Sequence, residues 1–305
     1  MLDIYRGLKR RFHEARFRRS AAAINQVASK PQFDQQANVT LLSMVQKKDV
    51  DMYLLAARSF IRYVNVSRIV IVADPSIDQA DRTQLAAQLQ AVEIVAAADF
   101  HDPDIPTGGT WERLTAISHY CQDSFVIQLD ADTLTVKDPL LVRQCIAGQR
   151  GFTLGSFQGQ QTAPLTQAAD FASSKLVEGK KNHVQLLAES KLTGLAEHFS
   201  RYVRGCSGFC GFPQGSFSIE TLRTISRYYR AQLGERWSDW GSEQFASNLV
   251  CANIPEVCVL PISEYADPKL LGDAPCFYHF IGPIRFTSEF YRRQAVAVLE
   301  ELNQG

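Results

Sequence analysis

The sequence predicts an α/β protein with a mostly parallel, twisted sheet flanked by helices. Two observations lead to this fold class. From Val39 onward, short apolar β-branched runs alternate with segments of helical periodicity. The composition, 46% hydrophobic and 21% charged over 305 residues, is that of an ordinary globular protein and excludes a disordered, collagen-like or coiled-coil chain.

The first half of the chain has the order β-α-β-α-β. The run Ser67 to Ala73 is rich in Ile and Val and ends at Asp74-Pro75, which is typical of a buried parallel strand followed by a turn. In sheets of this kind, ligands bind beyond the carboxyl ends of the strands. We expect strands at 39–45, 67–73 and 92–97, helices at 52–63, 79–90 and 111–120, and a further strand that begins at Ser124.

Residues 1–36 are predicted to form a basic N-terminal helical extension. The first 30 residues hold eight Lys and Arg against two acidic residues, a charge of +6, so the remainder carries −6 although the whole chain is neutral. A neutral chain has no global attraction to nucleic acid, and we expect no such partner. Ile4, Leu8 and Phe12 form an apolar stripe at helical spacing, with Tyr5 alongside. Such a helix could lie on a membrane surface, or pack on the protein with its arginines in water.

Targeting signals and cysteines favour a cytoplasmic protein that could be peripheral on the membrane. No stretch approaches the roughly 18 to 20 apolar residues of a spanning helix, and the Arg-rich start lacks the apolar region of a secretory signal. The seven cysteines are odd in number and scattered, which fits reduced thiols. Cys206 and Cys210 are a close pair without the second pair that a structural zinc site needs.

Paired carboxylates follow the strand that begins at Ser124. Asp130 and Asp132 are two residues apart, and at a strand end they can converge on a divalent cation. A diphosphate ligand needs such an ion, because bare carboxylates would repel it. The same pattern also serves turns and caps. Residues 133–135 lack the Gly and the charge of an EF-hand loop, and they lack the Gly-Thr step of a haloacid-dehalogenase-like phosphatase.

Four blocks, taken together in order and spacing, resemble the GT-A glycosyltransferases that use a nucleotide-sugar donor. The resemblance is to the retaining, family 8-type branch that includes glycogenin and the bacterial lipopolysaccharide galactosyl- and glucosyltransferases. It spans about Val39 to Arg285 and implies one catalytic domain at 37–290, with an acceptor-side helical insertion at 156–205 and a C-terminal helix at 291–305. The blocks are Trp111 to Leu114 with Val126 to Pro139, Cys206 to Phe212, Glu243 to Asn248 with Ile254 to Pro261, and His279 to Arg285.

The resemblance implies a metal site and a donor site. Asp132 and His279 would be direct ligands of Mn²⁺ or Mg²⁺, and Asp130 would bind the metal and face the ribose. Arg285 stands where the family usually has Lys and keeps the charge that binds diphosphate. For two of the donor positions given next there is a structural alternative: Asp74 could simply make a turn, and Arg113 could form an ion pair on a solvated helix. The further positions that the resemblance assigns to the donor are Ser43, Val45, Asp74, Arg113, Ala131, Ser207, Gly208 and Gly282.

Glu243 and Gln244 match the pair that lies below the anomeric carbon in the family. They would supply a nucleophile or stabilise an oxocarbenium-like transition state, and the sequence leaves open whether a covalent intermediate forms. Alternatively, Glu243 caps a core helix that contains Trp237, Trp240 and Phe245. Two departures from the family leave the donor open, with UDP favoured by analogy. Cys206 replaces an Asn, and the strand around Ser43 lacks an acidic residue.

The resemblance thus implies a metal-dependent hexosyltransferase that moves a sugar from a UDP-sugar or related donor to a glycan, lipid-linked or protein acceptor with retention. One alternative is a non-catalytic sugar-nucleotide or glycan-binding protein. Another is a sugar-nucleotide pyrophosphorylase, which is disfavoured because the first strand lacks a Gly-rich basic loop. Acceptor recognition is expected in 156–205, where four aromatic side chains could stack on sugar or pack in the core: Phe157, Phe171, Phe199 and Tyr202.

Overall fold

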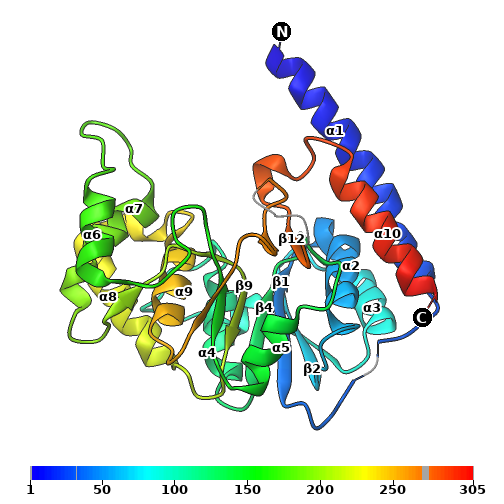
Figure 1. Cartoon of the computed structure of the whole chain (residues 1–305), viewed down its shortest axis with the longest axis horizontal. Helices are drawn as coiled ribbons and strands as arrows, with labels where there is room; N and C mark the ends of the chain where they lie inside the picture. The colour runs from blue at the N-terminus through cyan, green and yellow to red at the C-terminus, as the bar shows by residue number, and fades with distance from the viewer. Residues whose placement is uncertain (1, 32, 270–274, 305) are drawn as a thin grey trace. The chain divides into compact units, whose positions relative to one another are not determined.

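The computed structural model describes residues 2–31, 33–269 and 275–304 (Figure 1). Met1, Gln32, residues 270–274 and Gly305, which fall within the predicted segments, lie outside the described residues, and so do the side chains of Ile4 and Tyr5. The strands form a seven-stranded, mostly parallel sheet in the order β10-β6-β9-β4-β1-β2-β3, together with smaller sheets. The α/β class predicted from the sequence is confirmed.

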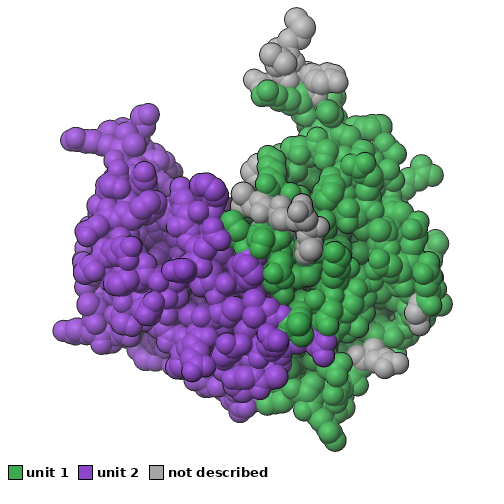
Figure 2. All heavy atoms as spheres, viewed as in Figure 1, with its two compact units in different colours: residues 1–95, 129–140, 262–305 green, residues 96–128, 141–261 purple. Residues whose placement is uncertain are grey.

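The chain divides into two compact units (Figure 2). Unit 1 contains residues 1–95, 129–140 and 262–305, and unit 2 contains residues 96–128 and 141–261. Each unit is therefore assembled from more than one stretch of the sequence. The domain limits at 37 and 290 stay predictions.

Strands and helices alternate along the first part of the chain. In unit 1, β1 and β2 are parallel, with Thr40 opposite Arg68 and Val45 opposite Ala73. Their β-branched and Leu side chains are almost all buried, as expected for a strand covered on both faces. The elements are α1 Leu2–Ala21, β1 Val39–Val45, α2 Val50–Ile61, β2 Arg68–Ala73, α3 Gln79–Gln88, β3 Val92–Ala96, α4 Trp111–Tyr120, β4 Phe125–Leu129 and β5 Thr133–Thr135.

The two terminal helices pack side by side in unit 1 (Figure 1). Phe17 on α1 is 1% exposed and stacks on Tyr291 of α10, with ring centroids 4.0 Å apart. His13 Nδ1 lies 2.6 Å from Glu289 Oε1 on the same side of α1. The helix thus buries a face other than the predicted apolar stripe, whose members Leu8 and Phe12 are 60% and 57% exposed.

A small three-stranded sheet in unit 1 has the order β11-β12-β5. Here β12 runs antiparallel to β5, and His279 is the partner of Thr133. The pairing places the chain around residue 279 beside the turn that follows β4. The remaining elements of unit 1 are β11 Tyr265–Ala266, β12 Phe277–His279 and α10 Phe290–Gln304.

Unit 2 is built around β6, which pairs in parallel with β10 and antiparallel with β9. Its core contains an aromatic cluster in which the Trp237 ring lies 5.5 Å from Trp111 and 4.8 Å from Tyr229. These rings join helices α4 and α8. The elements are α5 Leu140–Ala147, β6 Phe152–Leu154, β7 Ala163–Pro164, α6 Leu165–Ser173, α7 Val184–Glu189, β8 Arg201–Tyr202, β9 Cys206–Phe212, α8 Ile219–Leu233, α9 Ser242–Ala252 and β10 Cys258–Leu260.

Membrane-spanning capacity can be judged from the helices. Within the described ranges, no helix has both the length and the apolar character that crossing a bilayer requires. Helix α1 is 20 residues long but carries basic side chains along its length.

Candidate functional site

The turn between β4 and β5 in unit 1 carries the paired carboxylates. Strand β4 ends at Leu129, and the antiparallel pairing of β5 with β12 brings His279 next to Asp132. Asp130, Asp132 and His279 each offer one ligand atom, and these atoms all lie within 4.8 Å of one another. The resemblance placed these three residues in one site, and the structure brings them together as the Asp-Asp-His cluster.

The cluster is mostly buried and already paired. His279 Nε2 lies 3.3 Å from Asp132 Oδ1 and 3.7 Å from Asp130 Oδ2. The side chains of Asp132 and His279 are 9% and 6% exposed, whereas Asp130 is 28% exposed. Arg285 forms an ion pair with the second oxygen of Asp132, and its Nε donates to the Phe280 carbonyl at 3.1 Å. Four of the predicted site residues therefore lie in one place.

Electrostatics keep Asp132 ionised. Burial raises the pKa of this carboxyl, but the attraction of His279 and Arg285 outweighs burial and holds the pKa below its ordinary value. Asp49, which the sequence did not single out, is 6% exposed and interacts with the same arginine. Burial raises the pKa of Asp49 above its ordinary value, and Arg285 opposes that shift. The mostly charged segment Lys47 to Asp51 was the available signal for Asp49, but such segments are common on protein surfaces.

The main chain at the edge of the Asp-Asp-His cluster is accessible to a ligand. Gly282 begins a short 3₁₀ helix, η6 Gly282–Ile284, that leads into Arg285. A Cβ at Gly282 would meet no described atom within 4 Å, so a ligand can approach the main chain there. The Gly282 carbonyl accepts a hydrogen bond from Arg10 Nη2 at 3.3 Å. Ala131, between the two aspartates, is half-buried.

The predicted donor residues on β1 and after β2 lie in the same unit. Ser43 is fully buried, and its hydroxyl donates to the Leu129 carbonyl at 2.7 Å, which ties β1 to the end of β4. Val45 is buried at the end of β1 and accepts from the Asp74 amide at 2.9 Å. Asp74 Oδ1 accepts from the Ser76 amide at 2.9 Å, so this side chain makes the expected turn. A donor role for Ser43, Val45 and Asp74 stays a prediction.

Unit 2 holds a second polar cluster, centred on Glu243. Arg113 Nη2 on α4 lies 3.0 Å from Glu243 Oε1 on α9, and both side chains are almost fully buried. The other oxygen of Glu243 accepts from Ser207 at 3.2 Å and from Thr110 at 3.1 Å. The sequence assigned Arg113 and Ser207 to the donor and Glu243 to catalysis. The structure brings all three together within unit 2.

Gln244, the other predicted catalytic residue, is half-buried on α9. Its Nε2 donates to Gln185 Oε1 at 3.0 Å. Gly208 is buried within β9, next to Ser207. The alternative interpretation of this segment as one core helix is wrong for Trp240, which precedes α9 and is 75% exposed, whereas Trp237 and Phe245 are buried.

Sequence reasoning missed two partners of these residues. Thr110 has a left-handed backbone, with φ of 75°, and follows two glycines that also have positive φ. The Gly108-Gly109 pair was a sequence signal for a special turn there. Gln185 had no signal, because its role depends on the packing of α7 against α9.

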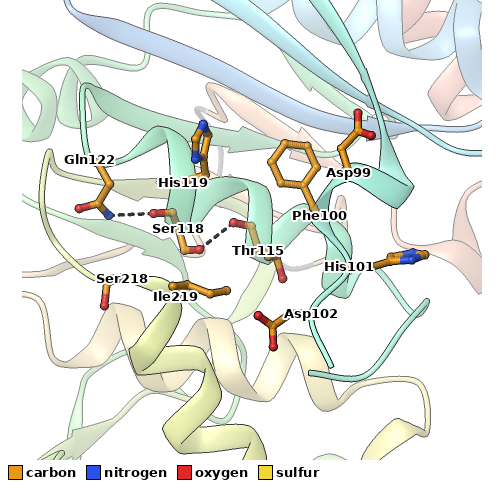
Figure 3. A pocket seen from close by; sticks show the side chains of 10 residues that line it. All are labelled: Asp99, Phe100, His101, Asp102, Thr115, Ser118, His119, Gln122, Ser218 and Ile219. Carbon is orange, nitrogen blue, oxygen red and sulfur yellow. Dashed lines mark hydrogen bonds between the residues drawn. The ribbon is translucent and has the colours of Figure 1, made fainter. Parts of the chain in front are cut away.

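A pocket of about 530 Å³ on unit 2 contains none of the predicted site residues (Figure 3). It lies between η3 Ala97–Phe100, α4 and the start of α8. Several of its polar groups are satisfied within the protein, whereas Thr115 Oγ1 has no hydrogen-bond partner among the described residues. The Ser118 hydroxyl donates to the Thr115 carbonyl at 2.7 Å, and Gln122 donates to the Ser118 carbonyl at 2.8 Å. Asp102 is held by Arg223 at 2.8 Å.

Comparisons with known proteins place the fold. No protein-family model and no curated protein matches the chain. An active-site mutant of LgtC superposes with a TM-score of 0.53 at 13% identity, over 87% of this chain and 95% of that one. The apo structure of WbbM, a bifunctional glycosyltransferase, gives 0.52 at 13% identity, over 91% of this chain but 53% of WbbM, so the chain spans about half of that protein.

A further LgtC structure is described as a galactosyltransferase in complex with donor and acceptor sugar analogues. It gives a TM-score of 0.49 at 12% identity, over 86% of this chain and 95% of that one. At 13% identity, the similarity of this chain to the LgtC mutant and to WbbM is a similarity of fold. The protein therefore has the GT-A fold that the sequence resemblance implied.

Proposed function

We propose that the protein is a metal-dependent glycosyltransferase. It would move a hexosyl group from a nucleoside-diphosphate donor, with UDP favoured, to a glycan, lipid-linked or protein acceptor with retention of configuration. The observation that carries the proposal is the Asp-Asp-His cluster on a GT-A sheet. The cluster follows the carboxyl end of β4, which is the end where open α/β sheets bind ligands. WbbM, a bifunctional glycosyltransferase that shares the fold, supports the same reaction class.

The residues of the cluster fit a divalent cation. Two carboxylates and one imidazole suit Mn²⁺ well, and Mg²⁺ would use the carboxylates. Asp132 and His279 would be the direct ligands, with Asp130 as a further ligand that also faces the ribose. When bound, the cation would neutralise charge on the diphosphate leaving group. Arg285 already holds Asp132 in place, and its remaining N–H groups can bind a phosphate oxygen.

The Glu243 cluster of unit 2 supports a role in stabilising charge at the sugar. Arg113, Ser207 and Thr110 hold the carboxylate in one orientation, and Arg113 compensates its charge. A carboxylate engaged in this way is a poorer nucleophile than a free one, because its lone pairs are occupied. We therefore propose that Glu243 stabilises an oxocarbenium-like transition state and that Gln244 presents its amide to the sugar.

Metal binding can be tested without an acceptor. We expect MnCl₂ alone to raise the melting temperature of the wild-type protein, because an ion that binds only the folded state stabilises it. Asp130→Asn, at a half-exposed position that should tolerate an amide, should abolish that shift. Asp138→Asn, in the exposed segment after β5, is the matched control and should keep it. Equal shifts in all three proteins would contradict the metal site.

Donor turnover is tested next with a panel of UDP- and GDP-sugars in the presence of Mn²⁺ or Mg²⁺. We expect hydrolysis of a UDP-sugar, and we expect Asp130→Asn to lower it by more than about 100-fold, since even residues that only support metal ligands cost 10 to 100-fold. NMR of the product anomer reports retention. Metal-dependent UDP binding without sugar release, with every acceptor offered, would instead support a non-catalytic sugar-nucleotide-binding protein.

We also propose that α1 attaches the protein to anionic membrane surfaces from the cytoplasmic side. Leu8 and Phe12 are exposed on one side of the helix, whereas Phe17 is buried. Exposed cations lie beside them at Arg11 and at neighbouring positions in the first half of α1. Apolar side chains between cations are the pattern of a helix that lies in the lipid interface. Each cation near an anionic surface contributes about 1 kcal/mol at most.

Vesicle sedimentation tests the attachment. Vesicles of phosphatidylcholine with about a quarter phosphatidylserine should bind the wild-type protein at low salt and release it at high salt, because screening weakens surface attraction. The double variant Leu8→Ser and Phe12→Ser should lose most binding while keeping donor hydrolysis. Unchanged binding by the double variant, or binding equal to that of pure phosphatidylcholine vesicles, would contradict the proposal.

A further inference from the structure

A second pocket of unit 2, of about 140 Å³, lies at α6 and β8. We call it the glutamine pocket and define it by Gln158, Gln161, Gln167, Phe171, Glu189 and Arg204, which line it. Apart from Phe171, each of these side chains has hydrogen-bonding capacity, yet the sequence predicted a role only for Phe171. The pocket lies entirely within unit 2 and within the segment 156–205.

The two charged residues that define the glutamine pocket neutralise each other. Glu189 is 1% exposed and forms an ion pair with Arg204. The Tyr202 hydroxyl donates to Glu189 at 2.9 Å, and Gln185 Nε2 donates to the same oxygen at 3.0 Å. Because the Arg204 guanidinium is already neutralised by Glu189, it attracts a free phosphate or carboxylate only weakly. An uncharged ligand fits these walls better.

The walls are held in place before any ligand binds. Arg204 Nη1 donates to the Gln158 side chain at 2.8 Å, which fixes one glutamine over the ion pair. Ser156 and Gly159 exchange backbone hydrogen bonds of 2.9 and 3.1 Å across a tight loop. A Cβ at Gly159 would lie 2.4 Å from the Arg204 carbonyl oxygen, so only glycine lets this loop pack so closely. A preformed pocket loses little entropy when it binds.

The remaining surface is aromatic. Phe171 is 38% exposed, and two cations lie near its ring: the guanidinium of Arg204 is 5.1 Å and Lys175 Nζ is 5.5 Å from the ring centroid. Glutamine amides both donate and accept, as sugar hydroxyls do, while an aromatic face covers the C–H side of a pyranose ring. We propose that the glutamine pocket binds one ring of a neutral saccharide acceptor. This inference rests on the proposed function and names the class of its acceptor.

A chain of hydrogen bonds joins this pocket to a proposed catalytic residue. Gln185 accepts from Gln244 at 3.0 Å and donates to Glu189 at 3.0 Å. The base of the pocket and Gln244 are thus two hydrogen bonds apart within unit 2. A saccharide held against Glu189 and Arg204 is bound on the same network that orients Gln244, which favours an acceptor role over an unrelated storage site.

Saturation-transfer NMR on the full chain, without donor, tests the inference. The probes are neutral mono- to trisaccharides of glucose, galactose, mannose and N-acetylglucosamine, with uridine as a second aromatic-stacking ligand. At least one saccharide should bind the wild-type protein, and Phe171→Ala should weaken it about tenfold, a change equivalent to about 1.4 kcal/mol. Phe157→Ala is the matched control, because this ring is 76% exposed and does not line the pocket.

The outcomes separate this inference from the proposed function. With a UDP-sugar donor, Phe171→Ala should raise the acceptor KM about tenfold, whereas Phe157→Ala should not. If saccharide binding depends on Phe171 but the protein turns over no donor, the saccharide pocket is supported and the proposed reaction is contradicted. Absence of binding by every saccharide, equal losses in Phe171→Ala and Phe157→Ala, or displacement of the saccharide from Phe171 by uridine would overturn the saccharide assignment.

Discussion

Replacement of Arg113 by Met should destabilise unit 2 strongly. The guanidinium is 6% exposed and lies 3.0 Å from a carboxylate that is 3% exposed, that of Glu243. Methionine fills a similar volume but leaves the Glu243 carboxylate buried without its cation. Loss of one partner of a buried ion pair costs about 3 to 5 kcal/mol. A second change, Glu243→Gln, removes the stranded charge, so the double variant should recover most of the loss.

Urea unfolding followed by tryptophan fluorescence is the appropriate assay. All three tryptophans of the chain, Trp111, Trp237 and Trp240, belong to unit 2, and the Trp111 indole donates to Ser242 at 2.9 Å, one residue before Glu243. The signal therefore reports the unit that contains the pair. Arg227→Met is the control, because this arginine is 55% exposed in its ion pair and should change the midpoint little.

Two results of the comparison between the single and double variants would refute this reasoning. A loss below about 1 kcal/mol in Arg113→Met, the range of an exposed ion pair, would refute the buried pair. So would a double variant that is less stable than either single variant. In either case, Glu243 would be free to act as a nucleophile, and the role proposed for it would have to change.

Three further predictions concern packing and thiol chemistry. Phe17→Ala should lower the free energy of unfolding by about 3 to 5 kcal/mol in thermal melts, because the ring is 1% exposed, whereas Leu8→Ala, at an exposed position, should change it by less than about 0.5 kcal/mol. A hydrogen bond from Cys145 lowers the pKa of the Cys258 thiol to about 7, against the opposing effect of burial. The thiolate therefore forms as the pH rises through about 7, and the rate of alkylation by iodoacetamide should rise with a midpoint at that pH. A midpoint at the ordinary thiol pKa of about 8.5 would contradict this. Gly211→Ala should cost about 1 to 3 kcal/mol in the fluorescence assay, because its Cβ would lie 2.2 Å from a buried phenylalanine ring, and an unchanged midpoint would show that the ring can move aside.

Local sequence patterns predicted the helices and strands well where a strong hydrophobic periodicity ends at a clear turn signal. The strand at 39–45 and the helix at 111–120 match β1 and α4 at both ends. Of the block Ile254 to Pro261 that the resemblance uses, only Cys258–Leu260 forms a strand, β10. Pro255 cannot donate to a ladder, and Glu256 has a φ of 52°, so the chain turns there before it extends.

Pairings over long sequence distances were harder to predict. The spacing of Asp130 and Asp132 indicated a cation site, and the resemblance supplied His279. Nothing local indicated that Arg113 pairs with Glu243, because they meet only once α4 and α9 pack in unit 2. The apolar stripe of α1 was visible as a pattern, but which side of the helix packs depends on α10, to which no local signal points.

The pairing of β5 with β12 determines when the Asp-Asp-His cluster can form. Arg285 and Asp132 are 153 residues apart in the chain, and β12 supplies the imidazole from the same late segment. During synthesis on the ribosome, the two aspartates emerge long before their partners. A nascent chain thus carries the two carboxylates without these partners until β12 pairs with β5, and the proposed ion site is assembled only then. If the proposed ion binds, its uptake would report the docking of β12, independently of any catalytic assay.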